Sequence, residues 1–287
     1  MNVTHEQRKA AQERMALEAM PRFGMLADEL DSLTNELFSE RIAYQPDDGA
    51  SVMVLSFVTK QREHLRSVRL LIDSKQHRDA HLIARTMIEG MGRLLWAFNR
   101  KPERTDLWLW FGAILDWRQT KKNEEKGRFV DPVEKVELKT YVDLHGPNYY
   151  RPKVRDAIAA ATVPGAPAYQ IPEDPWANDW TSTAVADMFA ELQAKSMYDG
   201  VYRDSSEWVH WGPRTILRAM QTADWGVAGF AEEDLRVALI AMQLGCQSLL
   251  QSLEVLDSHF TLGVTERLGE MGRRMVTIMF DAVEATR

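Results

Sequence analysis

The chain has 287 residues, which is room for one large domain or two modest ones with a substantial buried core. Lys and Arg together number 35, Asp and Glu number 42, and the formal net charge is −7. This mildly acidic balance excludes a generic polyanion binder, so any nucleic-acid role would need a local basic patch.

The single cysteine, Cys246, excludes an intrachain disulfide and a cysteine-rich metal site, and it fits a reducing compartment. Its leucine neighbours predict a buried, inert thiol. The N-terminal residues are charged and lack the apolar core of a signal peptide. No run approaches the ~20 apolar residues of a membrane span. We therefore expect a soluble, cytoplasmic protein with no membrane partner.

Apolar residues recur at three- and four-residue spacing along most of the chain, and almost none alternate with period two. The pattern predicts an all-α fold, a multi-helix bundle with one proline-rich excursion. In chain order, we expect helices over 5–41 (broken or kinked at Pro21), 51–73, 80–98, 103–127, 131–144, 152–161, 182–194, 197–213, 215–223, 232–260 and 264–285.

The helical pattern predicts a single domain, 1–287, made of an N-terminal helical extension (1–45), a core bundle (51–260) and a C-terminal helix (263–287). The segment 163–175 holds four prolines and cannot form regular structure. We interpret it as an ordered excursion or lid rather than a domain linker, because the helical pattern is alike on both of its sides.

The stretch 197–213, MYDGVYRDSSEWVHWGP, holds the densest group of charged and proton-carrying side chains. Tyr202, Ser206 and His210 are spaced i, i+4, i+8, so on a helix they form one slowly turning polar stripe. At roughly 100° per residue, Ser206 lies about 40° and Arg203 about 20° from the direction of His210. A hydroxyl four residues before an imidazole can hydrogen-bond it and fix its tautomer.

Arg85 and Glu89 are the second unusual feature, because both stand in a helical segment whose flanking residues are apolar. Buried charge destabilises a fold unless it is paired, so we expect the two to bond each other or to meet a partner on another helix. If they face the 202–210 stripe, five polar side chains converge inside an apolar bundle, the usual layout of a site in an all-α protein. The same groups could instead be a satisfied polar network that fixes helix register, with His210 an ordinary packed histidine.

Two motifs carry a resemblance to a known family. Arg85 and Glu89 in R-x-x-x-E, followed by Tyr202, Ser206 and His210 in Y-x-x-x-S-x-x-x-H, resemble a widespread prokaryotic family of helical proteins of unknown function over roughly residues 52–260. The family supplies no reaction. Its recurring polar residues correspond to these five positions, which favours a functional site over a structural network.

A second resemblance implies a mechanism. Arg203, six intervening residues and His210 are similar to the R-x(4–6)-H signature of the HEPN helical superfamily, many of whose members are metal-independent ribonucleases of toxin and defence systems that act as dimers. The resemblance implies that His210 is the general acid or base and that Arg203 binds the phosphate. Three features depart from it: the acidic chain, the spacer at its upper limit, and Glu207, which would repel phosphate within one turn.

Two other classes of function stay open. Ser206 activated by His210, with Glu89 orienting the imidazole, resembles a hydrolase triad in composition, although no G-x-S-x-G turn accompanies it. A plain small-molecule pocket lined by Trp96, Trp208 and Trp211 needs no nucleophile. The third possibility is an interaction protein that forms a homodimer through its long C-terminal helices.

Metal binding is the last alternative. His77 and His81 form H-x-x-x-H without the glutamate of H-E-x-x-H, and their place at a helix start indicates capping and solvent exposure. We expect no metal and no cofactor, and either RNA or a small molecule as the partner. The catalytic candidates are His210, Arg203, Ser206 and Glu89, and the ligand-binding candidates are Arg85, Tyr202, Glu207 and Trp208.

Overall fold

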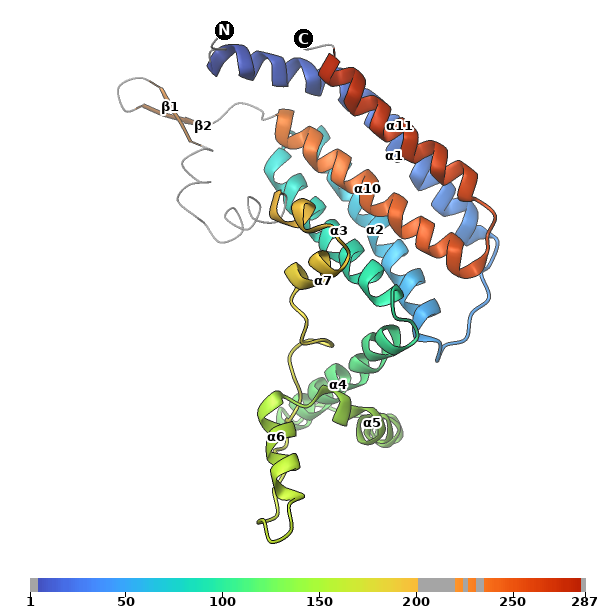
Figure 1. Ribbon diagram of the computed structural model, residues 1–287, viewed down its shortest axis with the longest axis vertical. Helices are drawn as coiled ribbons and strands as arrows, with labels where there is room; N and C mark the ends of the chain where they lie inside the picture. Colours follow the sequence, from blue (N-terminus) through green and yellow to red (C-terminus); the bar gives the residue numbers. More distant parts are fainter. Residues whose placement is uncertain (1–4, 201–219, 224–226, 231–234, 285–287) are drawn as a thin grey trace. The chain divides into compact units, whose positions relative to one another are not determined.

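The computed structural model describes residues 5–200, 220–223, 227–230 and 235–284 (Figure 1). The chain is an all-α multi-helix bundle, as its apolar spacing predicts. The helices are α1 (His5–Ser39), α2 (Gly49–Asp73), α3 (His77–Phe98), α4 (Glu103–Glu125), α5 (Pro132–His145), the 3₁₀ helix η1 (Gly146–Tyr149), α6 (Pro152–Ala161), α7 (Val185–Glu191), α10 (Leu235–Phe260) and α11 (Thr265–Glu284).

Several boundaries follow directly from local signals in the sequence. Asp131 caps α5, because its carboxylate accepts the backbone N–H of Val133 at 2.8 Å, and Pro132 occupies the first helical position. Pro152 begins α6 in the same way. The proline-rich segment 163–175 is irregular, as predicted.

Of the predicted break or kink at Pro21, the break does not occur, because α1 is one continuous helix with the proline inside it; its axis bends partway along its length, as a kink would make it do (Figure 1). Proline lacks the N–H that would bond the carbonyl four residues earlier, which belongs to Leu17. The Leu17 side chain is 63% exposed, so water reaches this part of the helix and can satisfy the carbonyl in place of the missing donor.

The expected helix at 215–223 is wrong where the chain is described. Strand β1 (Met220–Ala223) pairs antiparallel with β2 (Val227–Phe230), with Met220 opposite Phe230. Spacing alone cannot distinguish a helix from a strand in so short an apolar run. The helix expected at 182–194 is likewise shorter than predicted and is confined to α7.

Contacts divide the chain into two compact units. Unit 1 comprises Met1–Tyr44, Val54–Trp96 and Val185–Arg287, and unit 2 comprises Gln45–Met53 and Ala97–Ala184. The prediction that residues 1–287 form one domain, with its internal boundaries, concerns how these parts fold together and stays a prediction.

The core of unit 1 is built around α10, against which α1 packs along with α11 (Figure 1). α10 is the one helix in the described part of the chain with the length and composition to cross a membrane. However, 67% of its most apolar window is buried, which is typical of a core helix. The α1 residues with no exposed surface in this core are Ala16, Ala19, Phe23, Leu26, Leu30 and Leu33.

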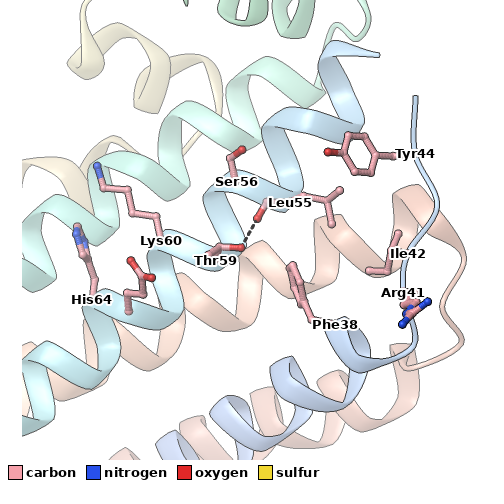
Figure 2. A pocket seen from close by; sticks show the side chains of 10 residues that line it. Phe38, Arg41, Ile42, Tyr44, Leu55, Ser56, Thr59, Lys60 and His64 are labelled. Atoms are coloured by element: carbon pink, nitrogen blue, oxygen red, sulfur yellow. Dashed lines mark hydrogen bonds between the residues drawn. The ribbon is translucent and has the colours of Figure 1, made fainter. Parts of the chain in front are cut away.

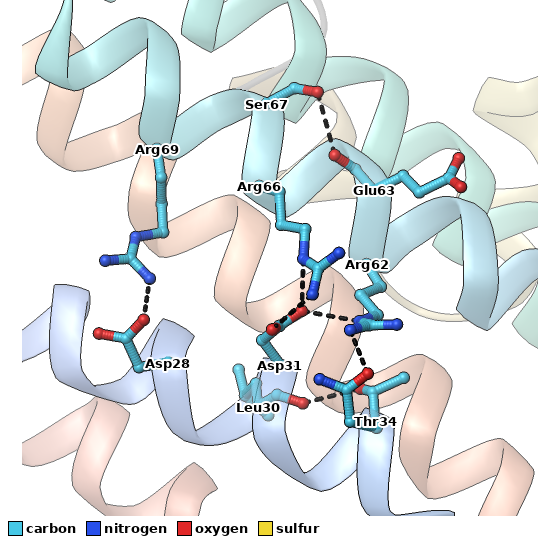
Figure 3. A network of polar contacts seen from close by, with 10 residues as sticks. Asp28, Leu30, Asp31, Thr34, Arg62, Glu63, Arg66, Ser67 and Arg69 are labelled. Atoms are coloured by element: carbon cyan, nitrogen blue, oxygen red, sulfur yellow. Dashed lines mark hydrogen bonds and ion pairs between the residues drawn. The ribbon is translucent and has the colours of Figure 1, made fainter. Parts of the chain in front are cut away.

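Charged pairs join α1 to the helices on both of its flanks. On the α2 side, Asp31 accepts hydrogen bonds from Arg62 at 2.7 Å and from Arg66 at 2.8 and 2.9 Å, and Asp28 pairs with Arg69 (Figure 3). On the α11 side, the pairs are Glu29–Arg274, Glu36–Arg267 and Arg22–Asp281. The pairs on the α11 side are the more exposed ones, and exposed pairs stabilise a fold weakly when taken singly.

Unit 2 is organised by the packing of α4, α5 and η1. The Tyr149 hydroxyl donates to the Leu107 carbonyl at 2.7 Å. The Trp110 ring stacks on His145, with ring centroids 4.3 Å apart and planes 2° from parallel. The end of the proline-rich segment is held by Arg118, which pairs with Asp174 at 2.8 Å, so this segment is an ordered excursion within unit 2.

Candidate functional site

Arg85 and Glu89 both lie on α3 and are half-buried, as expected of charges on an apolar helix. The Glu89 carboxylate accepts a hydrogen bond from Nε of Arg93 at 3.2 Å, and the two side chains are 29% and 20% exposed. Glu89 therefore bonds Arg93, one turn further along the helix, in place of the expected bond to Arg85; the other expectation, that Arg85 meets a partner on another helix, stays a prediction. The i, i+4 spacing of Glu89 and Arg93 was readable in the sequence.

The chain returns to α3 through α7. The Phe189 ring lies against Gly92 so closely that a Cβ at position 92 would come within 2.3 Å of the ring. Phe189 is 1% exposed. Next to it, the Trp96 indole N–H donates to the Glu191 carboxylate at 2.6 Å. An isolated glycine within a helical pattern is the sequence signal for such a close approach.

Residues 195–200 are helical and lead from α7 to the 197–213 stretch. The Tyr198 ring lies 5.6 Å from that of Phe189, centroid to centroid. The Gln247 amide of α10 contacts the Met197 sulfur at 3.6 Å. The start of the stretch is thus held beside the face of α3 that carries Gly92 and by the side of α10.

The six candidates further along this stretch lie outside the described residues: Tyr202, Arg203, Ser206, Glu207, Trp208 and His210. The same holds for Trp211. Their convergence with Arg85 and Glu89 stays a prediction. Of the expected pocket-lining residues, Trp96 is described, and it is 4% exposed with its N–H bound to Glu191.

For the metal alternative, one expectation is wrong: the solvent exposure of His77. His77 is only 5% exposed, so the expected solvent exposure is wrong for it. The reason is that His77 shares a helix face with Ala80 and Ala84, which are fully buried. Across the described ranges, no three His, Cys, Asp or Glu side chains are grouped so as to hold a metal ion.

The thiol of Cys246 is fully buried on α10, as predicted. Burial raises its pKa to about 12, because a thiolate in an apolar core lacks solvation. At neutral pH the group is therefore protonated and is no nucleophile.

Two further titratable residues with shifted pKa values, Asp106 and His145, lie in unit 2 and were not identified from the sequence. Burial and the nearby Asp48 raise the pKa of Asp106, although the Gly49 N–H bond opposes this. Burial lowers the pKa of His145, and the negative charge of Asp106 opposes that shift. His145 is also stacked on Trp110, so a neutral, packed imidazole explains this group without a ligand.

Comparison with known proteins gives one finding. A family model described as a family of unknown function (DUF5677) matches residues 51–226, more than half of the chain. No match is found among curated proteins or among solved structures. The matched region includes α3 with Arg85 and Glu89 as well as the whole of the 197–213 stretch. The chain belongs to this family of unknown function, DUF5677.

Proposed function

We propose that this protein acts on RNA as a HEPN-like, metal-independent ribonuclease of the toxin or defence type, in the cytoplasm. The observation that carries the proposal is the pair Arg203 and His210, which six residues separate. The polar residue Asp204 directly follows the arginine. The all-α fold is compatible with it.

The chemistry needs only a proton-transfer group and a cation. The ribose 2′-oxygen forms a bond to the adjacent phosphorus, the bond from phosphorus to the 5′-oxygen breaks, and a 2′,3′-cyclic phosphate results. In this proposal His210 either removes the 2′ proton while water protonates the leaving 5′-oxygen, or protonates the leaving oxygen while water takes the 2′ proton. Arg203 stabilises the charge that develops on the phosphoryl oxygens.

The described residues that precede Arg203 in the chain, and those on α3, support this proposal. Phe189 and Tyr198 hold the chain against α3 a few residues before Arg203. Glu89 is fixed in orientation by Arg93, as a residue that positions an imidazole must be. In the proposed site Arg85 contributes positive charge, which matters because the net charge of −7 offers RNA no general attraction.

The test compares the wild type with His210→Ala and Arg203→Ala, both by growth of overexpressing cells and by cleavage of a labelled single-stranded RNA in the presence of EDTA. We expect each variant to lose about 100-fold or more in cleavage rate, since general acid–base catalysis contributes ~10²–10⁴-fold. The matched controls are His259→Ala at the end of α10 and Arg128→Ala, an exposed arginine of unit 2.

Retained cleavage in His210→Ala, or no cleavage by the wild type on any RNA tested, would refute the proposal. An ester substrate assayed in parallel separates the hydrolase alternative: hydrolysis lost on Ser206→Ala, without any RNA cleavage, would favour a site made by Glu89, Ser206 and His210.

A further inference from the structure

A pocket of about 680 Å³ lies in unit 1 between the end of α1 and the middle of α2 (Figure 2). It forms because α1 ends at Ser39 and Arg41 adopts a left-handed backbone (φ 53°), which turns the chain away from the helix. Residues 41–44 then form one wall, and the outward side of α2 forms the other. The volume falls in the range of small-molecule sites.

The middle of the pocket is apolar. Phe38 from α1 and Leu55 from α2 line it together with Ile42, and all three are half-buried (Figure 2). The Tyr44 ring, 50% exposed, lies toward one end. These side chains offer an apolar surface, two of them aromatic, on which a flat organic group could pack.

The charged residues of the pocket are arranged differently from those on the other side of α2. There, Arg62, Arg66 and Arg69 are neutralised by acidic residues of α1 (Figure 3). In the pocket, by contrast, the side chains of Arg41 and Lys60 form no ion pair or hydrogen bond with any residue that the structure describes, and nor does His64. The described lining contains a single carboxylate, that of Glu63.

We propose that this pocket binds a small organic anion. Its carboxylate or phosphate head contacts Lys60 and His64, and its aromatic body packs against Phe38 and Leu55. A negative group satisfies cations that have no partner among the described residues, and the apolar wall supplies the surface burial that a free inorganic ion could not use. The site does not depend on Arg203 or His210.

Binding should also depend on pH through His64. Burial and the neighbouring Lys60 lower its pKa, and Glu63 opposes this. Arg41 and Tyr44 are the titratable groups on the facing wall. The imidazole is thus neutral at pH 7, and an anion beside it favours its protonated form. Affinity should therefore rise as the pH falls from 8 toward 5.5, with uptake of a proton.

The experiment titrates the full chain with three naphthyl probes in a calorimeter: 1-naphthoate, 1-naphthyl phosphate and the neutral 1-naphthalenemethanol. We expect each anion to bind at least tenfold more tightly than the neutral probe, and the comparison of the two anions shows which head is preferred. Lys60→Gln should weaken anion binding about tenfold and leave the neutral probe unaffected, while Lys60→Arg should retain most of it.

Two further variants keep the test decisive. Ser56→Trp adds bulk to an exposed position in the pocket without removing a core group, so it should abolish binding of the anions at an unchanged melting temperature. Lys122→Gln, an exposed lysine of α4, should leave binding unchanged. Equal affinity for the neutral and charged probes, or wild-type affinity in Lys60→Gln or Ser56→Trp, would overturn the proposal.

Discussion

At the scale of single residues, Asp31 shows how a carboxylate can fix one helix against another. It accepts hydrogen bonds from two arginines of α2 and is 24% exposed. Burial alone would raise its pKa, but the bonds from Arg66 and Arg62 outweigh this and lower it. A carboxylate with a lowered folded pKa stabilises the fold above its unfolded pKa, and this stabilisation is lost as the pH falls through the folded value.

We therefore expect Asp31→Asn to lower the free energy of unfolding by about 1–2 kcal/mol at pH 7. The difference should shrink as the pH falls below the unfolded-state pKa of about 4, and it should vanish as the pH falls through the lowered folded-state pKa. Urea unfolding at pH 7 and pH 3 measures both values. Asp28→Asn is the control, because Asp28 is 62% exposed and pairs with Arg69 alone, and it should change stability less. An equal loss in both variants would contradict this account.

Gly49, in the first turn of α2, lies close against α4. A Cβ there would lie 2.6 Å from the Asp106 carboxylate and 2.7 Å from the Thr105 carbonyl. Because the backbone carbonyl cannot move freely, we expect Gly49→Ala to destabilise the protein by about 1–3 kcal/mol. Gly112→Ala in α4 has no atom within 4 Å, so it should be neutral or stabilising by up to ~1 kcal/mol. Thermal unfolding compares the two, and the reverse order would refute the packing argument.

At the scale of secondary-structure elements, the long helices could be predicted because each has an apolar face and a clear start. The sequence placed α6 at 152–161, where the structure also has it, since Pro152 occupies its first position. The short elements could not be predicted in this way. α7 owes its position to Phe189 in contact with Gly92, and β1 owes its pairing to β2, so both depend on partners distant in the sequence or outside their own span.

In the candidate site, too, some features could be predicted from the local sequence and others depend on packing. Arg85 and Glu89 could be recognised because charge is unusual on an apolar helix, and their half-burial is confirmed. The partner of Glu89 was predicted wrongly, since two arginines, at i−4 and i+4, were equally available by spacing. Which arginine bonds a glutamate depends on side-chain rotamers and on the surroundings, and those are properties of the packed helix.

The contact between α3 and α7 gives a prediction at this scale. Gly92→Ala places a Cβ within 2.3 Å of the Phe189 ring, so α7 must shift away from α3. We expect a loss of about 1–3 kcal/mol in stability. Because residues 195–200 follow α7, the RNA cleavage proposed above should fall as well, although no proposed catalytic residue has changed.

The control for this prediction is Gly24→Ala in α1, where nothing lies within 4 Å of an added Cβ. It should leave stability and cleavage near wild-type values. A Gly92→Ala protein that keeps full activity would show that α7 does not position the stretch, whatever the change in melting temperature.

At the scale of the whole molecule, we propose that the homodimer expected from the sequence forms through α11. Val276 and Phe280 stand one turn apart on this helix and are 66% and 64% exposed. Burying such a pair against its copy gives association an apolar core. We expect Phe280→Glu to shift the molar mass measured by light scattering from dimer to monomer without unfolding.

Val136→Glu on α5 is the matched control, because Val136 is 67% exposed and belongs to unit 2. It should leave the dimer intact. A wild type that is monomeric at every concentration, or a dimer lost on Val136→Glu and retained on Phe280→Glu, would place the interface elsewhere.

The packing of α1 against α10 and α11 also bears on how the protein is made. The ribosome synthesises α1 first. The helices α10 and α11, which pack against the side of α1 that carries Phe23 and Leu30, begin only at Leu235. At a translation rate of ~5–20 residues per second, the apolar face of α1 stays uncovered for about 10–40 s. A chaperone that binds nascent chains would recognise this apolar face. A chain that terminates before Leu235 would lack α10 and α11 and would leave the face exposed.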